Sequence, residues 1–374
     1  MKPAPFKLEQ WFARYEFAVR LNMAASCAPA TTVAEILALG GPGAREEYLR
    51  LNLDYIPSTG SERLREAVAG WYRRIGAGGV QVTTGASEAI FILMNVLLEP
   101  GDIIVVEDPV YQSLYAVAES IGVRVKKWPL RPENRFRPDV DELERLLGPG
   151  VRAVVVNHPH NPTGAMLSTE DQRRLVELAD RFGFWLVSDE VYRGTVYDER
   201  DVLPPAADFG GRAVSIGDMT KPFGLGGLRI GWIASGDAGL LRRVRDFRDY
   251  TTMCSNAAGE FLAAIVLEHR DKVLESKTAL ARANLRMLSK FIAEHDGVLS
   301  WVPPAAGFTA FPRLYLNVDV ESFSAGLARE ESVLILPGTV FGVPDRFRLG
   351  FGMAERRFSD GLDALRRHLA RVSP

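Results

Sequence analysis

Lys221 has the surroundings of a lysine that does covalent chemistry. It stands between a short apolar run, residues 213–216, and a glycine-rich turn, residues 224–227, with few other charges nearby. We expect such surroundings to lower the pKa of the amine, which would make Lys221 competent to form a Schiff base with a carbonyl compound. The glycines lack the Gly-x-Gly-x-x-Gly spacing of a dinucleotide-binding loop. Because an isolated lysine is usually a solvated surface charge, the prediction depends on other segments.

A turn at Gly85 could hold an anionic group. Residues 80–84 form an apolar run, Gly85 turns the chain, and a helical pattern begins at Ala86 and Ser87. The free N–H groups at the start of a helix form a binding site for phosphate. Small polar residues at this position are also common as plain helix caps, so this segment alone leaves both interpretations open.

Two further polar segments follow apolar runs. Asp189 comes directly after residues 185–188, and a buried carboxylate at that point needs a cationic or hydrogen-bonding partner. Asn161 begins a proline and glycine turn that follows residues 153–157. Each of these segments alone is common in proteins. Together with the segments of Lys221 and Gly85, they mean that polar residues follow four separate apolar runs.

The elements that must position these residues alternate along the chain. Helical patterns separate short β-branched runs, and such alternation is typical of βα units that build a mostly parallel sheet. The seven predicted strands are residues 80–84, 103–107, 123–128, 153–157, 185–188, 213–216 and 230–234. Predicted helices include residues 87–98, 112–121, 168–182, 240–250, 256–268 and 272–295. Open sheets of this α/β class bind ligands at the carboxyl ends of their strands, which is where the four polar segments stand.

A second, smaller unit is expected after the sheet. At 374 residues the chain exceeds the size at which one hydrophobic core keeps growing. The predicted elements of this second unit are strands at residues 307–312, 333–336 and 347–351 and an amphipathic helix at residues 358–372.

In this order and spacing, the four polar segments resemble the class I and II aminotransferases of pyridoxal-5'-phosphate (PLP) fold type I. The resemblance extends over residues 54–366. It implies PLP as the cofactor and a large domain with a mostly parallel seven-stranded sheet, joined to a smaller α+β domain. The expected boundaries are 1–45 for an N-terminal arm that is part of the small domain, 46–270 for the large PLP-binding domain, and 271–374 for an interdomain helix and the small C-terminal domain.

The resemblance also implies a role for each matching residue around the cofactor ring. Lys221 would form the Schiff base with PLP and then move the proton between the substrate Cα and the cofactor. Asp189 would pair with the pyridine nitrogen, Asn161 and Tyr192 would hydrogen-bond the phenolic oxygen, and Tyr111 would stack on the ring. Core packing is the alternative interpretation of Tyr111.

The phosphate and the substrate carboxylate are assigned in the same way. The phosphate would lie on the backbone of Gly85, Ala86 and Ser87, assisted by Thr220 and Arg229. Arg348 is implied as the residue that binds the substrate carboxylate, with Arg346, two residues earlier on the same predicted strand face, as the fallback.

Two further positions bear on the cofactor site. Tyr55 resembles the tyrosine that reaches the phosphate of a neighbouring subunit, which implies a homodimer with shared active sites. Asp218 departs from the family pattern, because many members carry a serine three residues before the lysine. Its charge would repel a phosphate, so we expect that Asp218 turns away or that another donor compensates.

The resemblance leaves the reaction open. An aminotransferase would move an amino group between an L-amino acid and a 2-oxo acid. The N-terminal arm, residues 8–17, instead resembles a capreomycidine-synthase-type subgroup, which uses PLP for β-elimination and cyclisation of a hydroxyarginine. Both reactions pass through the same carbanion at Cα. A non-catalytic binding protein with this fold is the third hypothesis, and the presence of Lys221, Asp189 and Arg348 disfavours it.

Composition is typical of an ordinary globular protein. The formal net charge of -2 disfavours a nucleic-acid partner, and no run of about 20 apolar residues predicts a membrane span. The N-terminus lacks the apolar core of a signal peptide, so we expect a cytoplasmic protein. Cys27 and Cys254 are interpreted as reduced packing residues. His158 and His160 lack a third ligand with suitable spacing, so we interpret them as hydrogen-bonding residues and expect no metal site.

Overall fold

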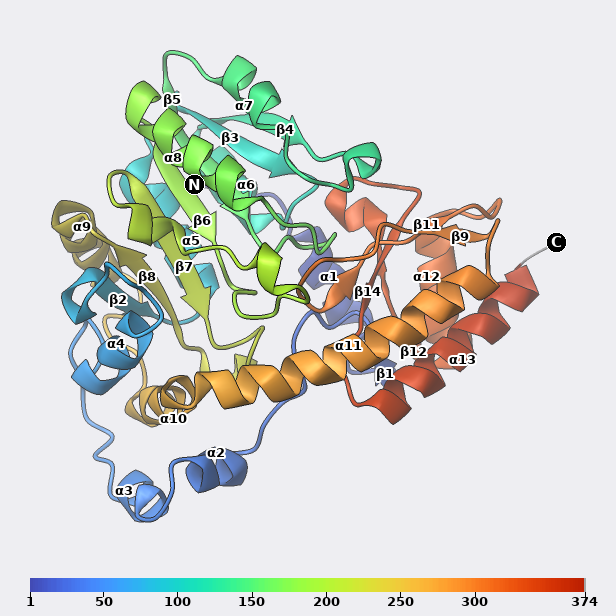
Figure 1. Ribbon diagram of the computed structural model, residues 1–374, viewed down its shortest axis with the longest axis horizontal. Coiled ribbons are helices and arrows are strands. Elements are labelled where there is room, and N and C mark those ends of the chain that lie inside the picture. The colour runs from blue at the N-terminus through green and yellow to red at the C-terminus, as the bar shows by residue number, and fades with distance from the viewer. Residues whose placement is uncertain (373–374) are drawn as a thin grey trace.

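The computed structural model describes residues 1–372 and is built on one seven-stranded sheet (Figure 1). The strand order is β2-β8-β7-β6-β5-β3-β4, and β8 runs antiparallel to both of its neighbours while the other pairs are parallel. The strands are β2 (Val80–Thr83), β3 (Ile103–Asp108), β4 (Arg124–Pro129), β5 (Val151–Asn157), β6 (Trp185–Asp189), β7 (Ala213–Asp218) and β8 (Gly231–Ser235). Each of the seven predicted runs is therefore a strand.

Two apolar cores explain why these runs are strands. In β3, Ile104 and Val106 belong to one buried cluster, and Ile103 and Val105 belong to another on the opposite face. Because successive side chains of a strand point to opposite faces, a strand with helices on both sides must be apolar at nearly every position. This is why the strands appear in the sequence as continuous apolar runs rather than as alternating ones.

Helices cover both faces of the sheet. One face is covered by α5 (Ala86–Leu97), α6 (Ser113–Ile121) and α9 (Ala238–Arg248), and the other by α7 (Val140–Leu146) and α8 (Thr169–Phe182). At the β2 and β8 edge, α4 (Glu62–Ala69) and α10 (Ala257–Glu268) pack together, with α2 (Val33–Leu39) and α3 (Ala44–Leu49) beyond them.

The long helix α11 (Arg270–Glu294) runs from the sheet towards the C-terminal part of the molecule (Figure 1). That part contains short strands together with α12 (Val320–Glu331) and α13 (Glu355–Val372). The strands are β9 (Leu299–Ser300), β10 (Thr309–Ala310), β11 (Arg313–Leu314), β12 (Val333–Leu334), β13 (Leu336–Pro337) and β14 (Phe347–Gly350). The N-terminal segment joins it, because β1 (Leu21–Asn22) pairs in parallel with β12, and α1 (Lys7–Tyr15) packs beside it.

Two strand predictions in this part were wrong in extent. The run 307–312 contains strand at Thr309–Ala310 and none at Pro312, because a proline has no N–H for the ladder. The run 333–336 is divided into β12 and β13, since the chain changes its pairing partner from β1 to β14 at Ile335.

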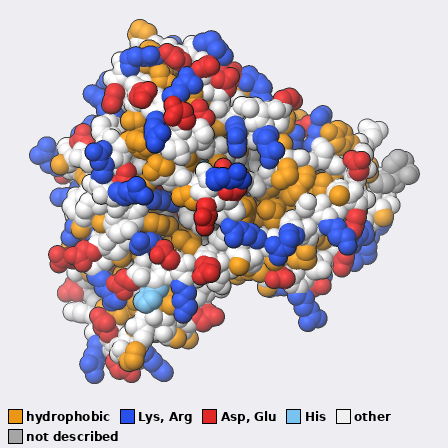
Figure 2. Space-filling model, in the orientation of Figure 1, with side chains coloured by type: hydrophobic (Ala, Val, Ile, Leu, Met, Phe, Trp, Pro, Cys, Tyr) orange, Lys and Arg blue, Asp and Glu red, His pale blue; other side chains and the backbone are white. Residues whose placement is uncertain are grey.

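The visible face of the molecule carries charges of both signs. Figure 2 shows Lys and Arg side chains interspersed with Asp and Glu, with apolar patches between them. Within the described part of the chain, no helix has the length and apolar character needed to cross a membrane.

Candidate functional site

The predicted site residues meet in one cavity of about 230 Å³. It lies beyond the carboxyl ends of β5, β6 and β7, next to the start of α5. The sequence-predicted residues that line it are Ala86, Ser87, Tyr111, Asn161, Asp189, Tyr192, Thr220, Lys221, Arg229 and Arg348. Gly85 adjoins it through Arg229. Tyr55 does not line it and is 80% exposed, so its contact with a neighbouring subunit stays a prediction.

Lys221 is half-buried, and its Nζ donates to Ser26 Oγ at 3.4 Å. The expectation of a lowered amine pKa was wrong. Burial alone would lower the pKa of Lys221, but the acidic groups around it, led by Tyr192 and Cys27, outweigh burial and raise the pKa above its ordinary value. The uncombined amine is therefore a cation near neutral pH, in a cavity that is also lined by Asp189, Asp218 and Arg348.

Asp189 and Tyr192 are polar groups with room for a partner. Asp189 is 3% exposed, and its Oδ1 accepts the backbone N–H of Val191 at 3.2 Å. Burial raises the pKa of Asp189 to about 7, which a cation beside it would reverse. The buried Tyr192 hydroxyl has no hydrogen-bond partner among residues 1–372. A pyridinium and a phenolic oxygen are groups that these two side chains would satisfy, so the residues present fit PLP.

Arg348 is held in place by two hydrogen bonds. Its Nη1 donates to Asn161 Oδ1 at 2.8 Å and its Nη2 to the Ala24 carbonyl at 2.7 Å, while its buried Nε has no partner in the described chain. Burial lowers the pKa of Arg348. Such a positioned guanidinium with an open donor is suited to a carboxylate. Arg346, the fallback, does not line this cavity, and its Nη1 donates to the Phe311 carbonyl at 3.0 Å.

The turn predicted to bind phosphate has the required backbone. Gly85 has φ +78°, and a Cβ there would come within 2.6 Å of Arg229 Nη2, so glycine keeps the guanidinium close to the turn. Asp218 does not turn away, because its carboxylate accepts the N–H groups of Ala86, at 2.9 Å, and of Thr220. A phosphate would have to displace this carboxylate from the Ala86 N–H.

A buried network that the sequence analysis missed supports the Asn161 turn. Glu107, fully buried in β3, accepts the Asn157 N–H at 2.8 Å through Oε2 and lies 2.7 Å from His158 Nε2 through Oε1. Asn157 Oδ1 in turn accepts the Asn161 N–H at 2.8 Å. An acid at the end of an apolar run, as at Asp189, was the signal that could have found Glu107.

His160 is the second hydrogen-bonding histidine of this turn. Its Nδ1 lies 2.7 Å from Thr163 Oγ1, and burial lowers the pKa of His160 to about 4, so the ring is neutral near pH 7. Both histidines therefore have the hydrogen-bonding roles expected from the sequence.

The N-terminal segment forms one wall of the cavity, and the sequence analysis had assigned none of its residues to the site. Leu8, Glu9 and Phe12 of α1 line it, together with Ser26. Glu9 is the acidic group of this wall, whereas Asp189 and Asp218 lie towards the predicted cofactor positions. Residues 8–12 meet the cavity because β1 pairs with β12, a long-range contact that a sequence pattern does not reveal.

Comparison with protein families gives one model match for this chain. The model described as Aminotransferase class I and II matches residues 45–365. The match covers the sheet, α11 and most of the C-terminal part, and it begins after α1 and β1.

Among curated proteins, the chain is similar to capreomycidine synthase of Streptomyces vinaceus. The two are 36% identical over 365 residues, which is 97% of this chain and 93% of the relative. Arginine–pyruvate transaminase of Pseudomonas aeruginosa is 29% identical over 79% of this chain and 77% of its own.

Among solved structures, two cover nearly the whole chain. A PLP-dependent aminotransferase from Streptococcus suis has a TM-score of 0.94 at 29% identity and covers 100% of both chains. The PLP-dependent cyclase OrfR has a TM-score of 0.92 at 34% identity and covers 99% of this chain and 98% of its own.

Proposed function

Because this chain belongs to the class I and II aminotransferase family and uses PLP, we propose that it converts an L-amino acid with a cationic side chain by β-elimination and cyclisation, as in capreomycidine synthase-type enzymes. The observation that carries the proposal is the position of α1. The segment that resembles the cyclase subgroup, residues 8–17, contains Leu8, Glu9 and Phe12, which line the cavity. The similarity to capreomycidine synthase also extends over 97% of the chain.

The cavity offers a binding group for each end of such a substrate. Arg348 lines the cavity, and its guanidinium, whose buried Nε has no partner within the described chain, would bind the α-carboxylate. Glu9 lies on the same cavity wall as Leu8 and Phe12, so a guanidinium or ammonium group at the far end of the substrate would face a carboxylate. Glu9 is exposed, and its attraction for a cation is therefore modest, on the order of 1 kcal/mol.

Lys221 is the group that moves the proton. When bound, PLP supplies an electron sink for the negative charge that develops at Cα. In its neutral form, the Lys221 amine would receive the Cα proton, and the Asp189 carboxylate would pair with the charged pyridine nitrogen. For a 3-hydroxy substrate, the protonated Lys221 would give its proton to the departing hydroxyl group, which leaves Cβ as water. A side-chain nitrogen would then bond to Cβ and lose its own proton, and Lys221 would return a proton to Cα. Leu8, Phe12 and Tyr111 provide apolar walls that hold the side chain close to Cβ.

A substrate panel tests the proposal. The holoenzyme is mixed with arginine, 3-hydroxyarginine and neutral amino acids, and cyclic product, keto acid and ammonia are measured. We expect a cyclic product from 3-hydroxyarginine without accumulation of pyridoxamine phosphate. Keto acid formed in stoichiometric amount with pyridoxamine phosphate would overturn the cyclisation proposal.

A substitution of Glu9 tests its role in binding the cationic side chain of the substrate. Glu9→Gln is expected to raise the KM for the cationic substrate by up to about fivefold and to leave the KM for a neutral amino acid unchanged. Glu46→Gln on α3, an exposed acid on the other side of the molecule, is the matched control. An equal rise in KM for cationic and neutral substrates would show that Glu9 does not recognise the charge.

Transamination between an L-amino acid and a 2-oxo acid is the second candidate. It is favoured by the structural similarity to the Streptococcus suis aminotransferase and by the arginine–pyruvate transaminase among the relatives. Lys221 would then return the proton to the cofactor rather than assist elimination. The same substrate panel decides between the two reactions.

We also propose that the enzyme is a homodimer with shared active sites. Tyr55, 80% exposed, and Leu53, 81% exposed, line a surface hollow together with Cys254. The neighbouring Thr252 donates to Glu88 of α5 and lies 3.3 Å from Thr84, so this surface adjoins the predicted phosphate turn. Light scattering of the purified holoenzyme tests the proposal, and a monomer that binds PLP normally would overturn it.

A further inference from the structure

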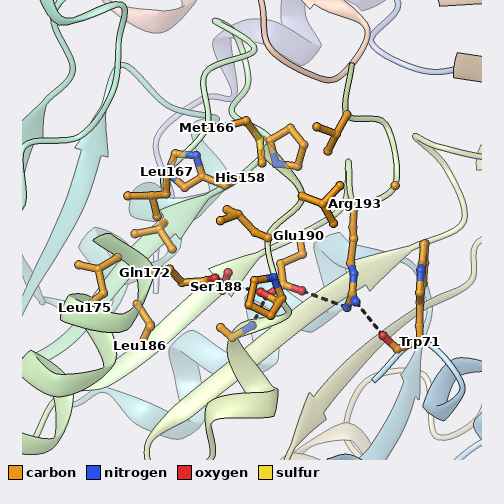
Figure 3. Close-up of a pocket in the computed structure, with 18 residues that line it drawn as sticks. Trp71, His158, Met166, Leu167, Gln172, Leu175, Leu186, Ser188, Glu190 and Arg193 are labelled. Carbon is orange, nitrogen blue, oxygen red and sulfur yellow. Dashed lines mark hydrogen bonds and ion pairs between the residues drawn. The ribbon is translucent and has the colours of Figure 1, made fainter. Parts of the chain in front are cut away.

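A second cavity, of about 200 Å³, is shown in Figure 3. Its apolar residues belong to the core on the face of the sheet that α7 and α8 cover, opposite to α5 beside the cofactor site. Residues at the end of β6 and just after it alternate between the two cavities. Leu186, Ser188 and Glu190 line the second cavity, whereas Asp189 and Val191 line the first. Neither the family's predicted roles nor the proposed reaction uses the second cavity, so it requires a separate explanation.

Two buried acceptors in this cavity lack a hydrogen bond within the described chain, although one of them, Glu190 Oε2, lies 3.7 Å from the likewise unpartnered Arg193 Nη1. Glu190, 7% exposed, accepts the Ala206 N–H at 2.8 Å and the Ser215 hydroxyl at 2.7 Å, both through Oε1. Its Oε2 has no hydrogen-bond partner in residues 1–372. Gln172, 5% exposed, donates to the Pro204 carbonyl at 2.9 Å, and its Oε1 is likewise unpartnered within the described chain. Unmet buried acceptors are costly, which favours a ligand that donates to them.

The charge in the cavity is already balanced. Arg193 Nη1 lies 3.7 Å from Glu190 Oε2, and Arg193 Nη2 donates to the Trp71 carbonyl at 2.7 Å (Figure 3). The guanidinium also stacks on Trp71, 5.4 Å from the ring centroid. Because Arg193 neutralises Glu190, an added cation would be repelled by one partner as much as it is attracted by the other. A neutral donor therefore suits the cavity better than a charged one.

The remaining walls are apolar and leave an opening at the surface. Leu167, Leu175, Leu186 and Met166 are buried around the cavity, and Figure 3 shows the three leucines on one side of it and Met166 above them. Val202, which also lines the cavity, is 57% exposed and marks its mouth. An apolar lining with a few polar groups is typical of small-molecule sites.

We propose that this cavity is a second binding site for a neutral, compact, mainly apolar molecule that carries one hydrogen-bond donor. Its volume sets the size of the ligand, since an apolar cavity of about 150 Å³ accommodates benzene. The ligand places its apolar body against the leucines and donates to Glu190 Oε2 or Gln172 Oε1. The proposal is independent of the reaction catalysed at the PLP site.

Phenol is the simplest probe of this chemistry, and toluene is its match without the donor. Titration calorimetry of the holoenzyme is expected to give a dissociation constant of about 0.1–1 mM for phenol and binding at least about tenfold weaker for toluene. Absence of phenol binding at about 10 mM would overturn the proposal and indicate a cavity that holds water alone. Equal binding of toluene would overturn the assignment of the two acceptors.

Two variants locate the bound phenol. Ala206→Leu adds bulk to the lining, and Val202→Trp places a large side chain at the mouth. Each is expected to weaken phenol binding about tenfold or more. Val33→Trp on α2, another exposed valine, is the matched control and should bind phenol as the wild type does. If Ala206→Leu fails to fold, Val202→Trp alone tests the location of the bound phenol. Unchanged phenol binding by Val202→Trp would overturn the proposal that phenol binds in this cavity.

Discussion

The carboxylate of Asp218 accepts the backbone N–H of Ala86 at 2.9 Å, at the helix start where the cofactor phosphate is predicted to bind. The Asp218 carboxylate and the cofactor phosphate would therefore compete for the Ala86 N–H group. Asp218 also accepts the Thr220 N–H, so the competition involves both strand-end turns that frame the phosphate position. PLP binding therefore includes the cost of moving a carboxylate away and of placing two anionic groups near each other.

Replacing Asp218 by serine should strengthen PLP binding. Asp218→Ser removes the charge and leaves a hydroxyl donor, so we expect the dissociation constant of PLP for the apoenzyme to fall about tenfold, or about 1.4 kcal/mol. Fluorescence titration of apoenzyme with PLP measures it. Asp237→Ser is the matched control, because Asp237 caps α9 far from the cavity and serine caps equally well. Weaker PLP binding by Asp218→Ser would mean that Asp218 supports the phosphate site.

Asp189→Asn should have opposite effects on the apoenzyme and on catalysis. The pKa of Asp189 is raised to about 7 by burial, above its ordinary value of 3.8. Such a carboxyl group destabilises the folded apoenzyme as pH rises above 3.8, and the cost is complete above about pH 7. Apo Asp189→Asn should thus be about 2–4 kcal/mol more stable than the wild type at pH 8 and equal to it near pH 4.

The same variant should lose activity with PLP. Asparagine cannot provide the negative charge that pairs with the pyridine nitrogen, so kcat is expected to fall about 100-fold or more. Chemical denaturation of the apoenzyme at the two pH values and steady-state assays of the holoenzyme give the two measurements. A stability difference that is the same at pH 4 and pH 8 would argue against ionisation of Asp189 as the cause.

The parts of the site that could be predicted are those encoded by short segments. β5, β6 and β7 are continuous apolar runs, so the strand ends that carry Asn161, Asp189 and Asp218 were identifiable. The direction in which the pKa of Lys221 shifts could not be predicted. It depends on Tyr192 and Cys27, which approach Lys221 only after folding.

Long-range pairing explains what was missed. Glu107 supports the Asn161 turn through the alignment of β3 with β5, in which Val106 faces Val155. Glu9 reaches the cavity through the pairing of β1 with β12, which joins residues more than 300 positions apart, such as Leu21 and Val333. A local apolar pattern contains no information about either pairing.

Gly85→Ala should weaken cofactor binding more than it weakens the fold. An alanine there is strained at φ +78°, and its Cβ would lie 2.6 Å from Arg229 Nη2, so the guanidinium must move from the phosphate turn. We expect PLP affinity to fall at least about tenfold and the free energy of unfolding by about 1 kcal/mol. Gly101→Ala is the matched control, because Gly101 has φ +92° with open space around its Cβ position. It should lose similar stability and bind PLP normally.

Arg348 and Arg346 lie two residues apart, yet lysine substitutions should affect them differently. Arg348 divides its donors between Asn161, Ala24 and the cavity, and a lysine has no planar fork to do so. Arg348→Lys is therefore expected to raise the KM for the amino acid substrate at least about tenfold. Arg346 stacks on Phe136, 5.2 Å from the ring centroid, and lies outside the cavity. Arg346→Lys should lower the free energy of unfolding by about 1 kcal/mol and leave KM within about twofold of the wild type. Steady-state kinetics and denaturation of both variants check this, and a larger KM change in Arg346→Lys would reverse the assignment of the substrate carboxylate.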